Sequence, residues 1–114
     1  MHELGIVVQI TKTLDSLVEE NQLEDVSRVT LEIGKVSGIV PDYLIDCWKY
    51  YRKNRPYLIY SSLTYEWIEA ITQCQSCKKE YDTITYGKEC PYCHSFHTYL
   101  IQGNECLIKE IEAQ

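Results

Sequence analysis

The sequence predicts an α+β fold in which two helices pack on a small three-stranded sheet. Three observations carry this prediction. Two segments repeat apolar residues at helical spacing, three segments have the composition of strands, and a cysteine-rich insert separates the last two strands. With 114 residues, of which 45% are hydrophobic, the chain is long enough for one modest core and too short for two.

The first helix is expected between residues 3 and 20, and the second from Pro41 to about Asn54. Apolar residues recur at steps of three and four in both segments, as on the buried stripe of an amphipathic helix. Pro41 suits a first helical position, and Pro56 follows the second helix. The expected core stripes are Leu4, Val7, Ile10, Leu14 and Leu17 in the first helix, and Leu44, Cys47, Trp48 and Tyr51 in the second.

Three strands are expected, from Arg28 to Gly34, from Leu63 to Ile71, and in the C-terminal segment ECLIKEIEAQ. The first two alternate apolar with polar residues, as a strand with one buried face does. The aliphatic residues of the third do not alternate cleanly, which predicts a break in its register. Two helices covering one face of this sheet would bury every apolar stripe.

The insert, residues 73–101, has few aliphatic residues and cannot build a core of its own. It contains CQSC, with Cys74 and Cys77, and CPYC, with Cys90 and Cys93, with twelve residues between the pairs. Two such turns brought together close a tetrahedral set of four thiolates, which selects zinc. The spacing therefore predicts a structural zinc ribbon at residues 73–101, inserted into an α/β domain of residues 1–72 and 102–114.

Two other uses of these cysteines are less consistent with the spacing. A thioredoxin-like redox site has one such pair, and iron–sulfur clusters mostly use other spacings. His94 and His97 follow the second pair and are possible auxiliary ligands when a thiol is protonated or oxidised, a use that would make the zinc site a pH or redox sensor as well as a structural site. The simpler interpretation makes both histidines exposed loop residues.

Charge and composition exclude several classes of function. The formal net charge of −6 disfavours nucleic acid as a partner. No apolar run approaches the roughly 18 residues that span a bilayer, and no secretory leader is evident, so we expect a cytoplasmic protein that binds no membrane. The sequence contains no Ser/His/Asp set and no glycine-rich phosphate loop, which predicts that the protein is not an enzyme.

The chain begins Met1-His2-Glu3. The Met1 amine, the His2 amide nitrogen and the His2 Nδ1 can close adjoining chelate rings around one metal ion, and the Glu3 amide or carboxylate can complete a plane. Nitrogen-rich planar sets suit Ni(II) or Cu(II) and do not suit zinc. Taken alone, a histidine here is more simply a solvated residue with no role.

Four segments together resemble the HypA/HybF hydrogenase nickel-incorporation family. They are MHE, VTLEIGKVSGIVPDYL, the pair CQSC and CPYC, and GNECLIKEIE, and they occur in order over nearly the full length. The resemblance implies a nickel metallochaperone with His2 as the indispensable nickel ligand and Met1 and Glu3 beside it. It also implies that Cys74, Cys77, Cys90 and Cys93 bind zinc.

The same resemblance implies partners. They are a nickel-binding GTPase of hydrogenase maturation and the large subunit of a [NiFe] hydrogenase, to which Ni(II) passes as transient cargo. We expect a monomer or a weak homodimer. The alternative function is a zinc-ribbon adaptor that binds other proteins and has no nickel role.

Overall fold

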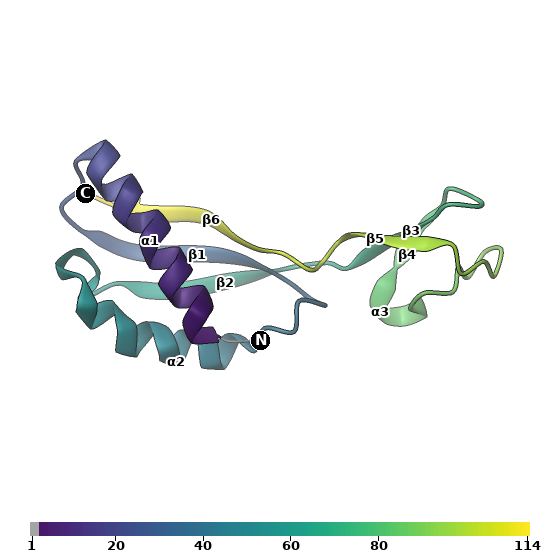
Figure 1. Ribbon diagram of the computed structural model, residues 1–114, viewed down its shortest axis with the longest axis horizontal. Helices are drawn as coiled ribbons and strands as arrows, with labels where there is room; N and C mark the ends of the chain where they lie inside the picture. Colours follow the sequence, from purple (N-terminus) through teal and green to yellow (C-terminus); the bar gives the residue numbers. More distant parts are fainter. Residues whose placement is uncertain (1–2) are drawn as a thin grey trace. The chain divides into compact units, whose positions relative to one another are not determined.

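The computed structural model describes residues 3–114 and has the predicted α+β class. The helices are α1 (Glu3–Asn21), α2 (Pro41–Tyr51) and α3 (Thr83–Tyr86), with two 3-10 helices, η1 (Arg52–Asn54) and η2 (Pro56–Leu58). The strands are β1 (Val26–Gly34), β2 (Ser62–Ile68), β3 (Ile71–Cys74), β4 (Glu80–Asp82), β5 (Thr98–Gln102) and β6 (Cys106–Ala113). They form two three-stranded sheets, ordered β2-β1-β6 and β4-β3-β5 (Figure 1).

The chain divides into two compact units. The first comprises residues 3–32, Ile39–Glu66 and Leu107–Gln114, and the second comprises Ile33–Gly38 and Trp67–Cys106. The predicted insert, residues 73–101, lies within the second unit, which is longer at both ends and also takes up the loop after β1. Backbone hydrogen bonds explain this, because Val36 N–H donates to Gly103 O at 2.9 Å and Lys35 N–H donates to Ile68 O at 3.0 Å.

In the first unit, α1 packs against α2, and the buried stripe of α1 differs in part from the predicted one. Val7, Ile10 and Leu14 are buried as expected, but Leu4 is 46% exposed. Thr11 takes a place in the stripe instead. Its hydroxyl donates to Val7 O at 2.8 Å, and this bond satisfies the polar group and allows its burial.

The second helix begins at Pro41 as predicted. Its α-helical part ends at Tyr51, and the chain then forms the two 3-10 helices η1 and η2. Trp48 is its largest buried side chain, 1% exposed. The indole Nε1 donates to Ser61 Oγ at 3.1 Å, and Ser61 Oγ donates to Leu58 O at 2.8 Å. This chain of bonds satisfies the buried polar groups and fixes η2 beneath α2.

The predicted strand from Leu63 to Ile71 is confirmed as far as Ile68, but its predicted end is wrong, because the chain changes sheets between Ile68 and Ile71. β2 ends at Ile68 and β3 begins at Ile71. At the break, Ala70 O accepts a hydrogen bond from Thr83 N–H at 3.0 Å, and Glu69 O accepts one from Gln102 Nε2 at 3.0 Å. These two carbonyls therefore do not pair with a neighbouring strand, and the hydrogen-bonded ladder of β2 does not continue into β3.

The C-terminal strand is confirmed, and so is its irregular pattern. In β6 the half-buried positions are Cys106 and Ile108 and then Ile111, so the buried face changes phase between Ile108 and Ile111. Leu107 is 52% exposed. The burial pattern therefore follows the break predicted from the uneven spacing of the aliphatic residues.

The second unit has almost no aliphatic core. β3 pairs antiparallel with β4 and with β5, and the buried cluster of this sheet consists of Cys74, Tyr81 and Cys90, with Cys77 packed against it. The Tyr81 hydroxyl donates to Gly87 O at 2.9 Å. Because the centre of this unit is made of thiols, its stability depends on what those thiols bind.

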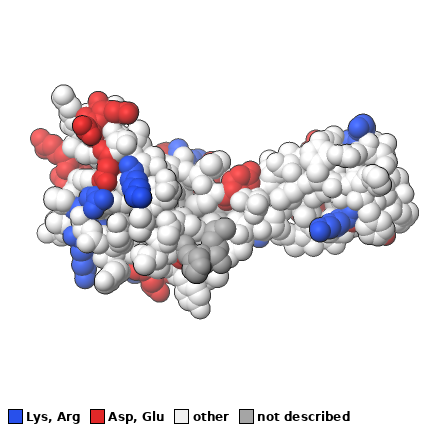
Figure 2. All heavy atoms as spheres, in the orientation of Figure 1, with Lys and Arg blue, Asp and Glu red and all other residues white. Residues whose placement is uncertain are grey.

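The formal net charge of the chain is −6. The face of the first unit visible in Figure 2 carries acidic and basic side chains side by side, with no continuous basic area. Among residues 3–114, no helix has both the length and the apolar character needed to span a bilayer.

Candidate metal centre

Each Cys-x-x-Cys pair is closed by the same backbone hydrogen bond. The N–H of Cys74, at the end of β3, donates to Lys79 O at 3.0 Å. The N–H of Cys90 donates to Ser95 O at 2.9 Å, and the acceptor is again the fifth residue along the chain. The two turns thus have the same local structure although they share no residue between the cysteines.

The residue after the second cysteine of each pair has left-handed backbone. Lys78 has φ +67° and His94 has φ +63°, and their N–H groups donate to Cys74 O at 3.0 Å and Cys90 O at 2.8 Å. Such φ values favour glycine or asparagine. Sequence reasoning missed this feature because neither lysine nor histidine signals it.

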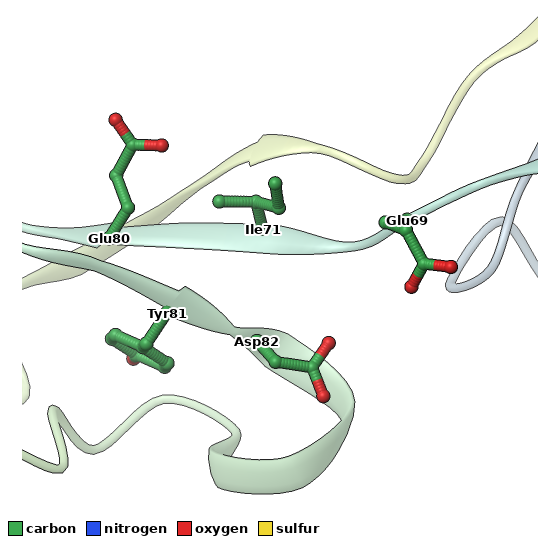
Figure 3. Close-up of a pocket in the computed structure, with 5 residues that line it drawn as sticks. All are labelled: Glu69, Ile71, Glu80, Tyr81 and Asp82. Carbon is green, nitrogen blue, oxygen red and sulfur yellow. The ribbon is translucent and has the colours of Figure 1, made fainter.

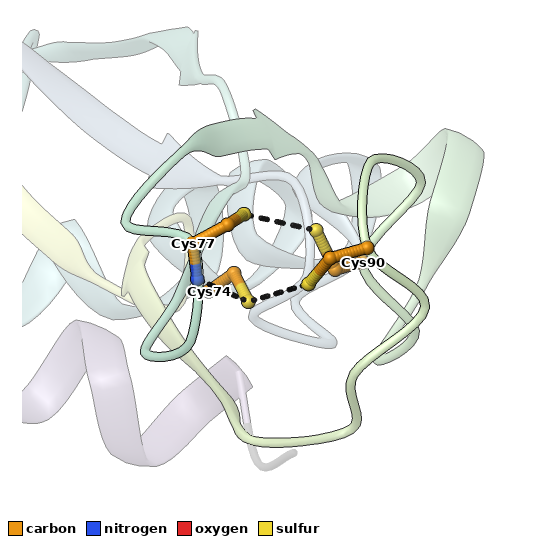
Figure 4. A group of neighbouring side chains, drawn as sticks. Cys74, Cys77 and Cys90 are labelled. Carbon is orange, nitrogen blue, oxygen red and sulfur yellow. Dashed lines mark hydrogen bonds between the residues drawn. The ribbon is translucent and has the colours of Figure 1, made fainter.

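The two turns bring the four predicted zinc ligands together, and Figure 4 labels Cys74, Cys77 and Cys90 of this group. The Sγ atoms of Cys74 and Cys93 are 3.5 Å apart, those of Cys77 and Cys90 are 3.6 Å apart, and all four lie within 4.8 Å of one another. Zinc–sulfur bonds of about 2.3 Å in a tetrahedron require sulfurs about 3.8 Å apart. The spacing therefore fits a zinc site made of four cysteines.

The thiols of Cys74 and Cys93 differ in acidity. The backbone N–H of Cys77 donates to Cys74 Sγ at 3.5 Å and lowers the pKa of the Cys74 thiol to about 6. The Ser95 N–H also favours the thiolate of Cys93, but the neighbouring sulfurs, first that of Cys74, together with burial raise the pKa of Cys93 to about 12. Cys93 therefore ionises beside Cys74 only when a cation offsets the repulsion between the two thiolates.

The two histidines near the second pair lie outside the sulfur cluster. His94 Nδ1 is 3.6 Å from a carboxylate oxygen of Glu89, and both side chains are exposed. His97 is exposed, and its backbone N–H donates to Ser95 Oγ at 3.0 Å. Within residues 3–114, the group of close metal-ligating atoms contains the four cysteines and neither histidine.

Of the three predicted nickel-binding residues, Met1 and His2 lie outside the described residues. Glu3 is described and begins α1. Its carboxylate Oε2 accepts a hydrogen bond from Val40 N–H at 3.2 Å. Glu3 and Val40 belong to the first unit, whereas the sulfur cluster belongs to the second.

A cavity of about 430 Å³ in the second unit is lined by three carboxylates, Ile71 and Tyr81 (Figure 3). Glu69 already pairs with Lys35 Nζ at 2.6 Å. Asp82 is the N-cap of α3 and accepts a hydrogen bond from Thr85 N–H at 3.1 Å. Two of the three carboxylates thus have structural partners.

Known proteins are similar to this chain over a range that includes both MHE and the two cysteine pairs. Residues 1–113 match the family model described as hydrogenase/urease nickel incorporation, metallochaperone, hypA. The hydrogenase maturation factor HypA of Geotalea uraniireducens is 30% identical, and the alignment covers 100% of both chains. The HypA of Crocosphaera subtropica is 34% identical over 100% of this chain and 96% of that protein.

Two solved structures have the same fold. The solution structure of the Ni metallochaperone HypA from Helicobacter pylori is 22% identical, with a TM-score of 0.77, over 99% of this chain and 97% of that chain. A solution structure of HypA protein is 21% identical, with a TM-score of 0.79, over 100% of this chain and 97% of that chain. Together with the family match over residues 1–113, this shows that the chain belongs to the HypA family of nickel-incorporation metallochaperones.

Proposed function

We propose that this metallochaperone holds Ni(II) through the Met1 amine, the His2 amide nitrogen and the His2 Nδ1, with Glu3 supplying the next donor. Cys74, Cys77, Cys90 and Cys93 hold zinc. The observation that carries the proposal is the family match over residues 1–113, because it includes MHE and both cysteine pairs. Family membership supports the nickel role and does not support the zinc-ribbon adaptor.

The two metals have different tasks, and each donor set suits its task. Four thiolates form a closed shell around zinc, which supplies charge and cross-links and leaves no position for an incoming ligand. A nitrogen-rich site at a chain terminus keeps one side open, so that an acceptor can exchange ligands without unfolding the carrier. We therefore assign cargo binding to the α/β domain and the structural metal to the zinc ribbon.

The proposed acceptors and donors belong to hydrogenase maturation. The chain exchanges Ni(II) with a nickel-binding GTPase and delivers it to the large subunit of a [NiFe] hydrogenase in the cytoplasm, and it has no catalytic activity of its own. The description of the family as serving hydrogenase and urease supports the first destination and adds urease as a second. His94 and His97 act as auxiliary zinc ligands only when a thiolate is lost.

Nickel titration by calorimetry tests the N-terminal site. The protein is untagged, loaded with zinc and begins with Met1, and it is compared with His2→Ala and with a variant that has one extra N-terminal residue. We expect wild type to bind one nickel per chain and both variants to lose this binding, because one lacks the imidazole and the other displaces the terminal amine. Equal binding by all three proteins would refute the terminal site.

Acidification is the second arm of this titration. The amine and imidazole bind nickel only when deprotonated, so nickel affinity should fall as the pH drops through about 6.5. The variant with the extra residue controls for acid effects elsewhere in the chain. An affinity that stays constant between mildly basic and mildly acidic buffer would contradict this ligand set.

A further inference from the structure

The start of α2 lacks a cap of its own. Val40 is the N-cap residue, with φ −98° and ψ 106°, and its side chain has no hydrogen-bonding group. Its carbonyl accepts the first helical bond, from Leu44 N–H at 3.1 Å. In a capping box, a Glu or Gln three residues into the helix bonds the N–H of the N-cap residue. That position holds Tyr43 here, which cannot play this part.

Glu3 takes the place of the missing capping residue. Its Oε2 accepts the Val40 N–H at 3.2 Å, and its negative charge lies where the α2 dipole favours an anion. The two residues are 37 positions apart. The hydrogen bond thus joins the first residue of α1 to the residue at which α2 starts, and α1 and α2 also pack against each other.

We propose that the Glu3 carboxylate positions the nickel-binding N-terminus by fastening the start of α1 to Val40, and that it is not itself a nickel ligand. This inference rests on the proposed nickel site at Met1 and His2. The donor that Glu3 supplies to nickel is then its backbone amide. Glu3 is a positioning residue, because it acts on nickel binding through the backbone that it fixes.

Two properties of the carboxylate support this role. A chelate ring closed through the Glu3 side chain contains more atoms than the rings closed through the Met1 amine and the His2 nitrogens. Closing a larger ring adds less to nickel affinity. Terminal helical residues fray unless a contact holds them. The bond to Val40 provides that contact at the point from which Met1 and His2 extend.

Three substitutions at Glu3 separate the two roles. Glu3→Gln keeps an oxygen that can accept the Val40 N–H and removes the charge. Glu3→Asp keeps the charge and shortens the reach by one methylene, and Glu3→Ala removes both. Nickel affinity is measured by calorimetry on zinc-loaded protein, and hydrogen exchange of the Val40 amide is measured by NMR on the same samples without nickel. Circular dichroism and zinc content confirm equal folding.

We expect Glu3→Gln to bind nickel within about 2-fold of wild type and to keep the Val40 amide protected. Glu3→Asp and Glu3→Ala should lose affinity by about 2- to 10-fold, the range of a single hydrogen bond, and their Val40 amide should exchange faster. The order of affinities is the decisive result, because a ligand role predicts the reverse order for Gln and Asp.

Two results would overturn the proposal. One is a loss of nickel by Glu3→Gln with retention by Glu3→Asp, which would make the carboxylate a ligand. The other is wild-type affinity and wild-type Val40 exchange in Glu3→Ala, which would remove the anchor. If wild type itself binds no nickel, the terminal nickel site fails, and the Val40 amide still shows separately whether Glu3 holds α2.

Discussion

At the scale of single residues, the zinc site depends on the backbone at two positions outside the cluster of four cysteines. Lys78 and His94 each follow a cysteine pair and turn the chain through left-handed backbone, at φ +67° and +63°. A residue other than glycine pays roughly 1–2 kcal/mol for this conformation. The fold of the site therefore contains strain at both turns, and a glycine at either position should relieve it.

Replacing His94 by Gly tests this at the residue scale. We expect the variant to hold zinc as tightly as wild type or more tightly, by about 1 kcal/mol, because glycine adopts positive φ without strain. Lys78→Gly is the matched control, since it has the same backbone geometry and removes no imidazole. Zinc transfer to a competing chelator measures the effect. Faster zinc loss from His94→Gly alone would show that the imidazole is a zinc ligand.

At the scale of elements, one cluster of side chains joins α1 to the turn that follows α2. Asp15 accepts hydrogen bonds from Arg55 Nε at 2.9 Å, through Oδ1, and from an Arg55 terminal nitrogen at 3.0 Å, through Oδ2. The Tyr57 hydroxyl also donates to Asp15. The Arg55 guanidinium lowers the pKa of Asp15, with a smaller contribution from Tyr57. The cluster thus holds η1 and η2 against α1.

Asp15→Asn should lower the free energy of unfolding by about 1 kcal/mol near neutral pH, since the pair is partly exposed and bidentate. The pKa of Asp15 is lowered in the folded state, so its contribution is complete above the ordinary aspartate value of about 4 and disappears as the pH falls through the folded value. Urea denaturation of both proteins across this range checks the prediction.

The control for this measurement is Asp46→Asn on the exposed side of α2, which should change stability by less than about 0.5 kcal/mol. All these proteins carry the same zinc site, so loss of zinc in acid cancels in the difference. A wild-type advantage over Asp15→Asn that persists at the lowest pH would contradict an electrostatic role for Asp15.

The helices and strands also show which parts of the fold a sequence pattern can predict and which it cannot. Periodicity predicted α1, α2, β1 and most of β2, whereas β6 was predicted from its richness in Ile and Leu. Periodicity did not predict the break between β2 and β3, because the apolar residues Ile68, Ala70 and Ile71 continue beyond Trp67, where the alternation ends. The break depends on Gly103, at φ +118°, where an added Cβ would lie 2.6 Å from Ala70 Cα. Such a contact between distant residues leaves no local signal.

At the scale of the whole molecule, the sequence predicted the cluster of cysteines better than the contacts that support the termini and loops. The four cysteines are recognisable because zinc requires thiolates at fixed spacing, and the structure brings them together. The contact of Glu3 with Val40 was not predictable, because it joins residues 37 positions apart and no spacing in the sequence links the two segments. The place of the loop after β1 in the second unit was not predictable either, because it depends on backbone hydrogen bonds to Ile68 and Gly103 and on the pair of Lys35 with Glu69, which leave no local pattern.

The central claim is that one chain carries nickel and zinc at separate sites in separate units. Native mass spectrometry of untagged protein, equilibrated with both metals, counts each metal directly in wild type, His2→Ala and Cys93→Ser. We predict one zinc and one nickel per chain in wild type, zinc alone in His2→Ala, and nickel with loss of zinc in Cys93→Ser. Retention of nickel by His2→Ala would contradict the claim, because nickel would then bind elsewhere in the chain.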